Sequence, residues 1–264
     1  MPHSDPGADP TTLSISPRYV ATIFTALVLS LVTMHLVTGI LDYQFGHDYQ
    51  WGFRFQFNVD NEGNIPAWYS SSALLVASFL LALIGATKYK RRDAFATHWL
   101  VLAGMFLYLS MDEASQLHEM SARLFDRFHP SGLFFYPWVI VGALVVLMVG
   151  LAYLKFLLHL PPEIRRIVLV AGSIFVGGAL GVEAISGRHH ELHGLNNLTY
   201  HVIVGIEEGC EMAGIVMFIY GLVRYLALTA DRVVLAFRDD AGGPALIGRS
   251  AGLRSGGGKS GRAA

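Results

Sequence analysis

Six apolar runs of about 20 residues constrain this chain more than any other feature. A helix of that length crosses the roughly 30 Å hydrocarbon core of a bilayer. Only 15% of the 264 residues are charged, against about 25% in a typical soluble domain. The runs therefore predict an all-α, polytopic membrane protein built as a six-helix transmembrane bundle. The predicted spans are residues 19–41, 68–88, 96–119, 137–159, 167–187 and 200–228.

The segments on either side of these spans differ in composition. Residues 1–18 are rich in Pro, Ser, Thr and Asp, and residues 229–264 are rich in Gly, Ser, Ala and Arg. Neither segment can bury enough apolar surface to form a core. We expect two disordered cytoplasmic tails around one transmembrane domain, residues 19–228.

Lys and Arg fall mainly on one side of the predicted spans. Of the 19 basic residues, all but Arg54, Arg123, Arg127 and Arg188 lie on one side of the spans, in the terminal segments, in loops or in the span ends that face that side. Cytoplasmic loops carry such an excess. We therefore expect an integral protein of a bacterial inner membrane with both termini cytoplasmic, and with loops 42–67, 120–136 and 188–199 extracytoplasmic.

The first outer loop has an alternating pattern. Aromatic and apolar residues at Trp51, Phe53, Phe55, Phe57 and Val59 are separated by single glycine or polar residues, and the turn sequence 60–63 follows. Period-two alternation beside a turn predicts a short extracytoplasmic β-strand or hairpin between the first two helices. Its aromatic face either covers the outer end of the bundle as a lid or serves as an aromatic belt at the membrane interface.

Acidic and histidine side chains gather in the outer halves of the spans. The direction of each helix places residues 112–119, Glu183 and residues 201–211 in the extracytoplasmic leaflet. An acid near the bilayer centre costs about 2.5–3.5 kcal/mol on insertion scales. Several acids together require shared protons, a water-filled cavity or bound cations.

The residue types favour a metal site of one or two ions. A mixture of Asp, Glu and His suits iron, manganese or zinc, whereas carboxylates alone suit calcium or magnesium. We expect a transition metal, with iron or zinc favoured over manganese or copper. Helical spacing places Asp112 and Glu119 on one face and Glu113 off it. The candidate ligands are Asp112, His118, Glu119, Glu183, His201, Glu208 and Glu211, with Glu207 as candidate general base.

A site at this depth is reached by membrane lipid and other apolar small molecules. The leading hypothesis is a metal-dependent enzyme that oxidises such a substrate if the metal is iron, or hydrolyses it if the metal is zinc. Two alternatives stay open: a proton or divalent-cation transporter, and an accessory subunit with protein partners in a membrane complex. The near balance of 19 basic and 20 acidic residues argues against nucleic-acid binding.

Three further patterns bear on the interpretation. Glycines within the fifth and sixth spans, Gly178 and Gly214 among them, predict closely approaching helices. His189, His190 and His193 follow the fifth span, where solvated interfacial residues are common. The sequence has no Walker loop, no HExxH pair and no set of histidine boxes, so no family is indicated.

Overall fold

The structure, a computed structural model, describes residues 15–45, 52–117 and 130–229. The regular structure in these ranges is entirely helical, which confirms the predicted all-α class. The chain divides into two units, residues 1–229 and 230–264, and the description below concerns the first. The predicted tails lie outside the described residues, apart from residues 15–18 and Thr229.

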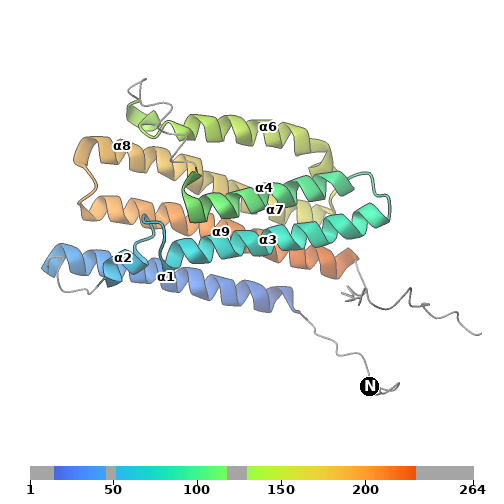
Figure 1. Cartoon of the computed structure of the whole chain (residues 1–264), viewed down its shortest axis with the longest axis horizontal. Helices are drawn as coiled ribbons and strands as arrows, with labels where there is room; N and C mark the ends of the chain where they lie inside the picture. Colours follow the sequence, from blue (N-terminus) through green and yellow to red (C-terminus); the bar gives the residue numbers. More distant parts are fainter. Residues whose placement is uncertain (1–14, 46–51, 118–129, 230–264) are drawn as a thin grey trace, which may run out of the picture. The chain divides into compact units, whose positions relative to one another are not determined.

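Long helices make up most of the described chain (Figure 1). Four are uninterrupted: α1 (Pro17–Phe45), α3 (Ile65–Lys90), α6 (Trp138–His159) and α9 (Leu198–Thr229). A fifth helical run joins α7 (Pro162–Val176), the π-helical segment η4 (Gly177–Val182) and α8 (Glu183–His193). The shorter elements are α2 (Phe53–Phe57), α4 (Ala96–Ser115) and the 3-10 turn η3 (Gly132–Phe134).

Five of these helical runs are long and apolar enough to cross a membrane: α1, α3, α6, the run from Pro162 to His193, and α9. The predicted count was six. The run that falls short is α4, whose 20 residues include the polar side chains of His98, Asp112 and Glu113. These side chains lower its mean hydropathy, and α4 packs closely against the more apolar α3.

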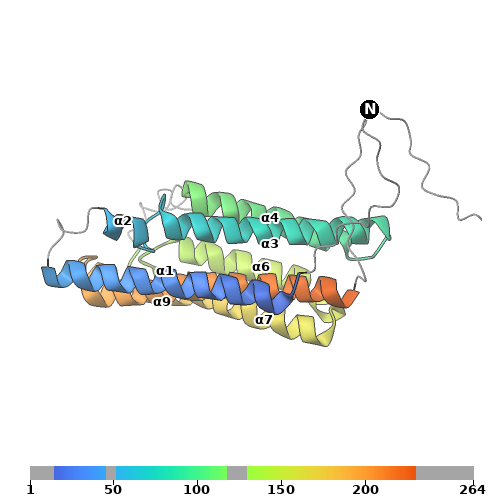
Figure 2. The same cartoon turned by 90° about the horizontal axis from the view of Figure 1, so that it is seen from below.

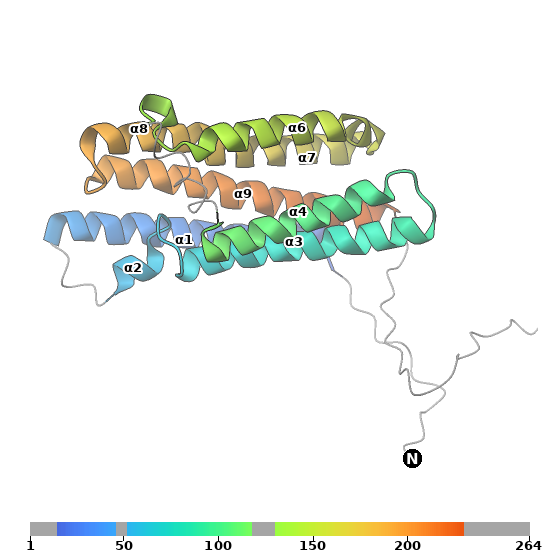
Figure 3. The ribbon, with the colours of Figure 1, turned by 45° about the horizontal axis from the view of Figure 1, so that its top comes forward.

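Helix α9 contacts more of its neighbours than any other helix in the described chain. It packs against α1, α3, α7, η4 and α8, and Figures 2 and 3 show it running alongside α1 and α7. Large apolar side chains fill the space around it, including the fully buried Leu81, Phe156, Ile164, Ile219 and Leu222. Helix α9 therefore contacts helices from widely separated parts of the sequence.

Polar side chains cap the start of α3 and join α3 to α4. The side chain of Asn64 accepts a hydrogen bond from the backbone N–H of Ala67 at 3.1 Å, which caps the start of α3. Further along, the hydroxyls of Ser71 and Ser110 each donate to the other residue's carbonyl, at 2.7 and 2.8 Å. Ser78 donates to the carbonyl of Ala103 at 2.8 Å. These bonds satisfy hydroxyls that would otherwise be buried unpaired between apolar helices.

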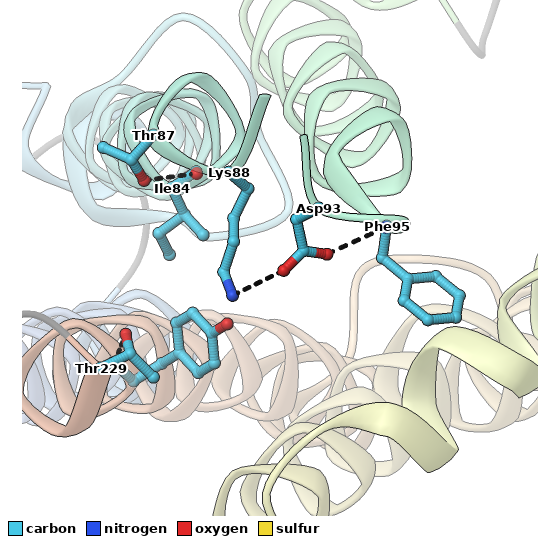
Figure 4. Close-up of polar contacts among 7 residues, drawn as sticks. Ile84, Thr87, Lys88, Asp93, Phe95 and Thr229 are labelled. Atoms are coloured by element: carbon cyan, nitrogen blue, oxygen red, sulfur yellow. Dashed lines mark hydrogen bonds and ion pairs between the residues drawn. The ribbon is translucent and has the colours of Figure 1, made fainter. Parts of the chain in front are cut away.

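The turn from α3 to α4 is held by Asp93 (Figure 4). One carboxylate oxygen accepts from the backbone N–H of Phe95 at 3.0 Å, and the other binds the Lys88 ammonium at 2.9 Å. These two interactions, that with the Phe95 N–H first, hold the pKa of the Asp93 carboxyl below its usual value. The Lys88 ammonium also lies 5.8 Å from the ring centroid of Tyr225, which joins this turn to α9.

The predicted strand in the first outer loop is wrong for the described residues. Residues 53–57 form the single helical turn α2, and the rings of Phe53 and Phe57 stack at 6.2 Å, as residues four apart on a helix do. A lone hairpin has little stability without a third strand or a helix to cover it. Trp51 lies outside the described residues, and Val59 is buried against α1 and α9.

Two predicted helix ends also differ from the structure. Helix α4 ends at Ser115 rather than Glu119 because Gln116 adopts a left-handed backbone conformation, with φ of 56°, and its N–H bonds the Asp112 carbonyl. The fifth helical run extends to His193, beyond the expected end at residue 187. His189 and His193 therefore share a helix face, and their rings stack at 4.6 Å.

The side chains of α6 that point away from the other helices are large and apolar. Leu147, Met148, Leu151 and Leu158 each expose more than half of their surface, up to 67% for Leu151. A contiguous apolar face of this kind is unfavourable in water and favourable against hydrocarbon. This arrangement is consistent with a helix that faces lipid.

Gly178 sets the distance between η4 and α9. A Cβ atom at this position would lie 2.8 Å from the Glu207 carbonyl oxygen and 3.0 Å from Cys210 Cβ, both on α9. Its neighbour Gly177 has open space at the same position.

We expect Gly178→Ala to lower the free energy of unfolding by about 1–3 kcal/mol, because the added methyl group overpacks this contact. Gly177→Ala is the matched control and should be neutral or stabilising by up to about 1 kcal/mol, because Ala favours helix more than Gly does. Thermal unfolding of both variants in detergent measures the difference. Equal melting temperatures for the two variants would contradict the close contact at Gly178.

Candidate functional site

A cavity of about 730 Å³ lies among α3, α4, α6, α8 and α9, next to the segment between α2 and α3. Acidic side chains dominate its polar wall. They are Asp60, Glu62, Asp112, Glu113, Glu183, Glu207, Glu208 and Glu211. None of the lining residues among the described ranges is Lys, Arg or His. We call this space the acidic cavity.

The structure brings five of the predicted site residues to this cavity. Asp112 comes from α4, Glu183 from the start of α8, and Glu207, Glu208 and Glu211 from two successive turns of α9. These segments are far apart in the sequence, so their meeting depends on the packing of α9 against its neighbours. The predicted ligands His118 and Glu119 lie outside the described residues.

Three acids of the cavity were not predicted for it. Glu113 was placed off the polar face of its helix, yet it lines the same wall as Asp112. The cavity is wide enough to border both residues, so helical spacing alone does not exclude Glu113 from its wall. Asp60 and Glu62 belong to the segment that the sequence assigned to a turn. Their position follows from the burial of Val59 against α1 and α9, which no local pattern specifies.

Glu207 is the most deeply buried of the acids, with 5% of its surface exposed. Its Oε2 atom has no hydrogen-bond donor within reach among the described residues. The side chain lies beside Ser186 and beside a second carboxyl group, that of Glu183. Glu183 accepts a hydrogen bond from the Trp138 indole at 3.1 Å. Two adjacent carboxyl groups of this kind need a shared proton, hydration by water of the cavity or a bound cation.

The other two acids of α9 extend this cluster. Glu208 and Glu211 are half-buried and lie within electrostatic range of each other, of Glu113 and of Glu183. Helix α9 and η4 approach closely at this level, because a Cβ atom at Gly178 would meet atoms of both Glu207 and Glu211. A π-helical turn such as η4 rotates the residues that follow it, and these turns are frequent at functional sites.

The predicted ligand His201 does not line the cavity. Its Nε2 atom lies 3.4 Å from an Arg54 guanidinium nitrogen, and Arg54 pairs with Asp42 at 3.0 Å. His35, only 1% exposed, donates from Nε2 to the carbonyl of His201 at 2.9 Å and accepts the Val59 N–H at Nδ1. The two histidines thus join α1, α9 and the segment that carries Val59.

No three of the described His, Cys, Asp or Glu side chains converge in a geometry that holds one metal ion. The acids approach in pairs instead, such as Glu183 with Glu207. Away from the acids, the wall of the cavity is apolar. It includes Leu74, Leu109, Val145, Phe175 and Ile215. The space therefore has a carboxylate region and an apolar region side by side.

Two further groups at the cavity have perturbed acidity. Asp60 borders the cavity. Desolvation by neighbouring protein atoms raises the pKa of its carboxyl above the usual value, and the hydrogen bond donated by Tyr200 at 3.1 Å opposes this shift. Burial raises the pKa of the Tyr136 phenol to about 12. Tyr136 therefore stays protonated at neutral pH.

The raised pKa of Asp60 gives a testable pH dependence. A carboxyl whose pKa is higher in the folded state adds stability below its unfolded pKa of about 3.8, and this stability is lost as the pH rises through the folded value. We expect the melting temperature of Asp60→Asn, relative to that of the unsubstituted protein, to be higher at pH 8 than at pH 4. Thermal unfolding in detergent with a chelator present measures this. A difference that stays constant between pH 4 and pH 8 would contradict the raised pKa.

Comparison with known proteins identifies the family of the chain. No curated protein and no solved structure matches it. Residues 21–226 match a family described as Domain of unknown function (DUF8692). The matched region includes every residue that lines the acidic cavity, from Val59 to Ile215. Because the match covers more than half of the 264 residues, the chain belongs to the DUF8692 family.

Proposed function

We propose that this chain is an integral membrane protein whose acidic cavity binds a divalent metal cation and serves as the active site of an enzyme that acts on a lipid or other apolar molecule. The main support is the convergence of Glu183, Glu207, Glu208 and Glu211 on one cavity. There, the buried Oε2 atom of Glu207 has no hydrogen-bond donor among the described residues. A bound cation would compensate this concentration of negative charge.

The proposed topology has six crossings, with α4 as the sixth membrane helix beside α3. The uneven distribution of Lys and Arg supports cytoplasmic termini and a bacterial inner membrane. In this orientation, α1, α4 and α8 end at the extracytoplasmic side, and α3, α6 and α9 begin there. The acidic cavity then lies in the extracytoplasmic half of the bundle.

The residues that line the cavity bear on the choice of metal. His201 faces Arg54, so the described lining offers carboxylate oxygens without imidazole. Such a set suits Mn²⁺, Mg²⁺ or Ca²⁺ better than Zn²⁺. Iron or zinc, the metals expected from the sequence, fit if His118 joins the ligands. Because the carboxylates approach in pairs, binding one ion requires side chains of the cavity to rotate toward it.

An apolar substrate is supported by the second region of the cavity. Tyr108 of α4 and Val141 and Val145 of α6 line the cavity and also expose between 38% and 55% of their surface. These residues sit where the cavity reaches the outer surface of α4 and α6. In a membrane this surface faces hydrocarbon, so a lipid tail could pass from the bilayer to the apolar wall while its polar head meets the acids.

Within this proposal Glu207 holds or moves a proton. It is buried beside Glu183, and a carboxyl in such surroundings is suited to general acid or base catalysis. Glu208 and Glu211 would hold the cation, which would polarise the substrate or activate water. The Trp138 indole orients Glu183 by its hydrogen bond and so fixes one partner of Glu207.

Transport is the weaker candidate. A through-pathway would need polar side chains from the acidic cavity to the opposite end of the bundle. That region holds Leu81, Ile84, Trp99 and Phe156, each no more than 3% exposed. These side chains form one packed apolar core among the described helices. The cavity is therefore better suited to an active site that a substrate enters from one side than to a transport pathway.

The proposal predicts stoichiometric metal binding. The protein purified in detergent without chelators should carry or take up about one or two equivalents of Mn²⁺ or a related cation. Glu208→Gln and Glu211→Gln should each weaken binding by about tenfold or more, since each variant removes a carboxylate ligand. Elemental analysis and calorimetric titration with Mn²⁺, Fe²⁺ and Zn²⁺ measure this.

Glu163→Gln is the matched control, because Glu163 pairs with Arg224 on an exposed surface away from the cavity. It should bind metal as the unsubstituted protein does. If no cation binds, or if the cavity variants bind as tightly as Glu163→Gln, the metal site proposed here is excluded.

A further inference from the structure

Every charged side chain in the described wall of the acidic cavity is an acid. Arg54 lies outside this wall, where it pairs with Asp42 at 3.0 Å and lies 3.4 Å from Nε2 of His201. The head group of an amphiphile that enters the cavity therefore meets hydrogen-bond acceptors and negative charge. An anionic head group, such as a phosphate or a carboxylate, would be repelled there, and a cationic one would be attracted.

Glu207 supplies an acceptor that the described protein leaves unused. Only 5% of its surface is exposed, and its Oε2 atom has no hydrogen-bond partner among the described residues. Glu183 lies within electrostatic range of Glu207, and both line the cavity. A ligand that brings N–H donors and a positive charge to this pair would offset its charge and would offer Glu207 a donor.

Aromatic side chains belong to the same part of the cavity wall. Trp138 donates to Glu183 at 3.1 Å, and Tyr136 and Tyr200 also line the space. The faces of aromatic rings attract cations, and ammonium groups are often bound by them. The wall around Glu183 thus combines the two residue types that favour an ammonium head group, and it has no described residue that favours an anion.

The cavity also has room and an entrance for an alkyl tail. Its volume is about 730 Å³, and Leu109 and Phe175 belong to its apolar wall. Tyr108 of α4 and Val145 of α6 line the cavity and expose 55% and 43% of their surface. An amphiphile that enters from the bilayer between α4 and α6 would leave its tail on the apolar wall and bring its head to the acids.

We propose that the acidic cavity binds an amphiphile with a primary ammonium head group and a long alkyl tail, and that Glu183 and Glu207 hold the ammonium. This inference rests on the proposed function, because it names the class of apolar molecule on which the cavity acts. A primary ammonium carries three N–H donors for carboxylate acceptors, whereas a quaternary ammonium has none. Glu208 and Glu211 stay available for the metal cation.

Equilibrium binding of radiolabelled dodecylamine tests this proposal. The full chain is kept at pH 7 in a neutral maltoside detergent with a chelator, so that no metal ion takes part. Partition into protein-free detergent micelles is measured separately and subtracted. Dodecylamine is a cation at this pH, and unlabelled dodecylamine should compete about tenfold or more better than dodecanol or dodecanoate, which carry a tail of the same length.

Two further competitors separate the head group from the tail. Butylamine has the same ammonium and a short tail, and it should compete about tenfold or more less well than dodecylamine, because it buries much less apolar surface. Dodecyltrimethylammonium has the long tail and the positive charge without N–H donors. It should also compete less well than dodecylamine, since it cannot donate to the carboxylates.

The residues are tested by Glu183→Gln and Glu207→Gln. Each should weaken dodecylamine binding by about tenfold, because it removes one negative charge and keeps the shape of the side chain. Glu163→Gln is the matched control, since Glu163 pairs with Arg224 on an exposed surface, and it should bind as the unsubstituted protein does. The competition series uses the unsubstituted protein, so it decides the proposal even if a cavity variant does not fold.

The outcomes that overturn the proposal are distinct. Equal competition by dodecanol or dodecanoate overturns recognition of the ammonium, and equal competition by butylamine overturns a ligand drawn from the membrane. Cavity variants that bind as tightly as Glu163→Gln overturn the assigned residues. A protein that binds Mn²⁺ but not dodecylamine keeps the metal site and overturns this inference alone. A protein that binds dodecylamine but no metal keeps this inference and excludes the metal site.

Discussion

The mutual repulsion of carboxyl groups enclosed by apolar helices is the constraint on which this structure depends. Glu183 and Glu207 lie side by side in the wall of the acidic cavity, and Glu208 and Glu211 continue the same wall. Several ionised acids cannot stay this close without compensation, because each would lose its hydration and face its neighbours' charge. Shared protons, water in the cavity and bound cations are the available forms of compensation. The proposed metal site uses a bound cation.

The helices around the acids are arranged to keep them together. Gly178 lets the π-helical segment η4 approach α9 so closely that a methyl group would meet the Glu207 carbonyl oxygen. Gly214, further along α9, meets Phe175 and the Ala171 carbonyl in the same way. The acids of α9 are thus fixed from one side by backbone contact, and they open to the cavity on the other. Packing of small residues, rather than hydrophobic burial alone, sets this geometry within a membrane.

The sequence predicted the helices well because the membrane imposes a simple pattern, a long apolar run for each crossing. It also predicted that Asp112, Glu183 and the acids of α9 would meet, since helix direction alone places them at one depth. It could not predict the helical turn of residues 53–57, where alternating aromatics resemble a strand but the described residues offer no partner strand. Asp60 and Tyr200 were missed because their contact joins residues 140 apart, and no periodicity encodes such a pair. His201 was predicted to be a ligand, but it lies beside Arg54 and does not line the cavity. The depth of a residue along a helix does not determine the direction of its side chain.

The most direct measurement of the central claim is the position of an anomalous scatterer in crystals of the protein grown with Mn²⁺. Data collected at the manganese absorption edge locate the ion independently of any assumption about its ligands. The account predicts an anomalous peak inside the acidic cavity, in contact with carboxylate oxygens of Glu208 or Glu211. A cavity without such a peak, or a peak bound only at the protein surface, would contradict it.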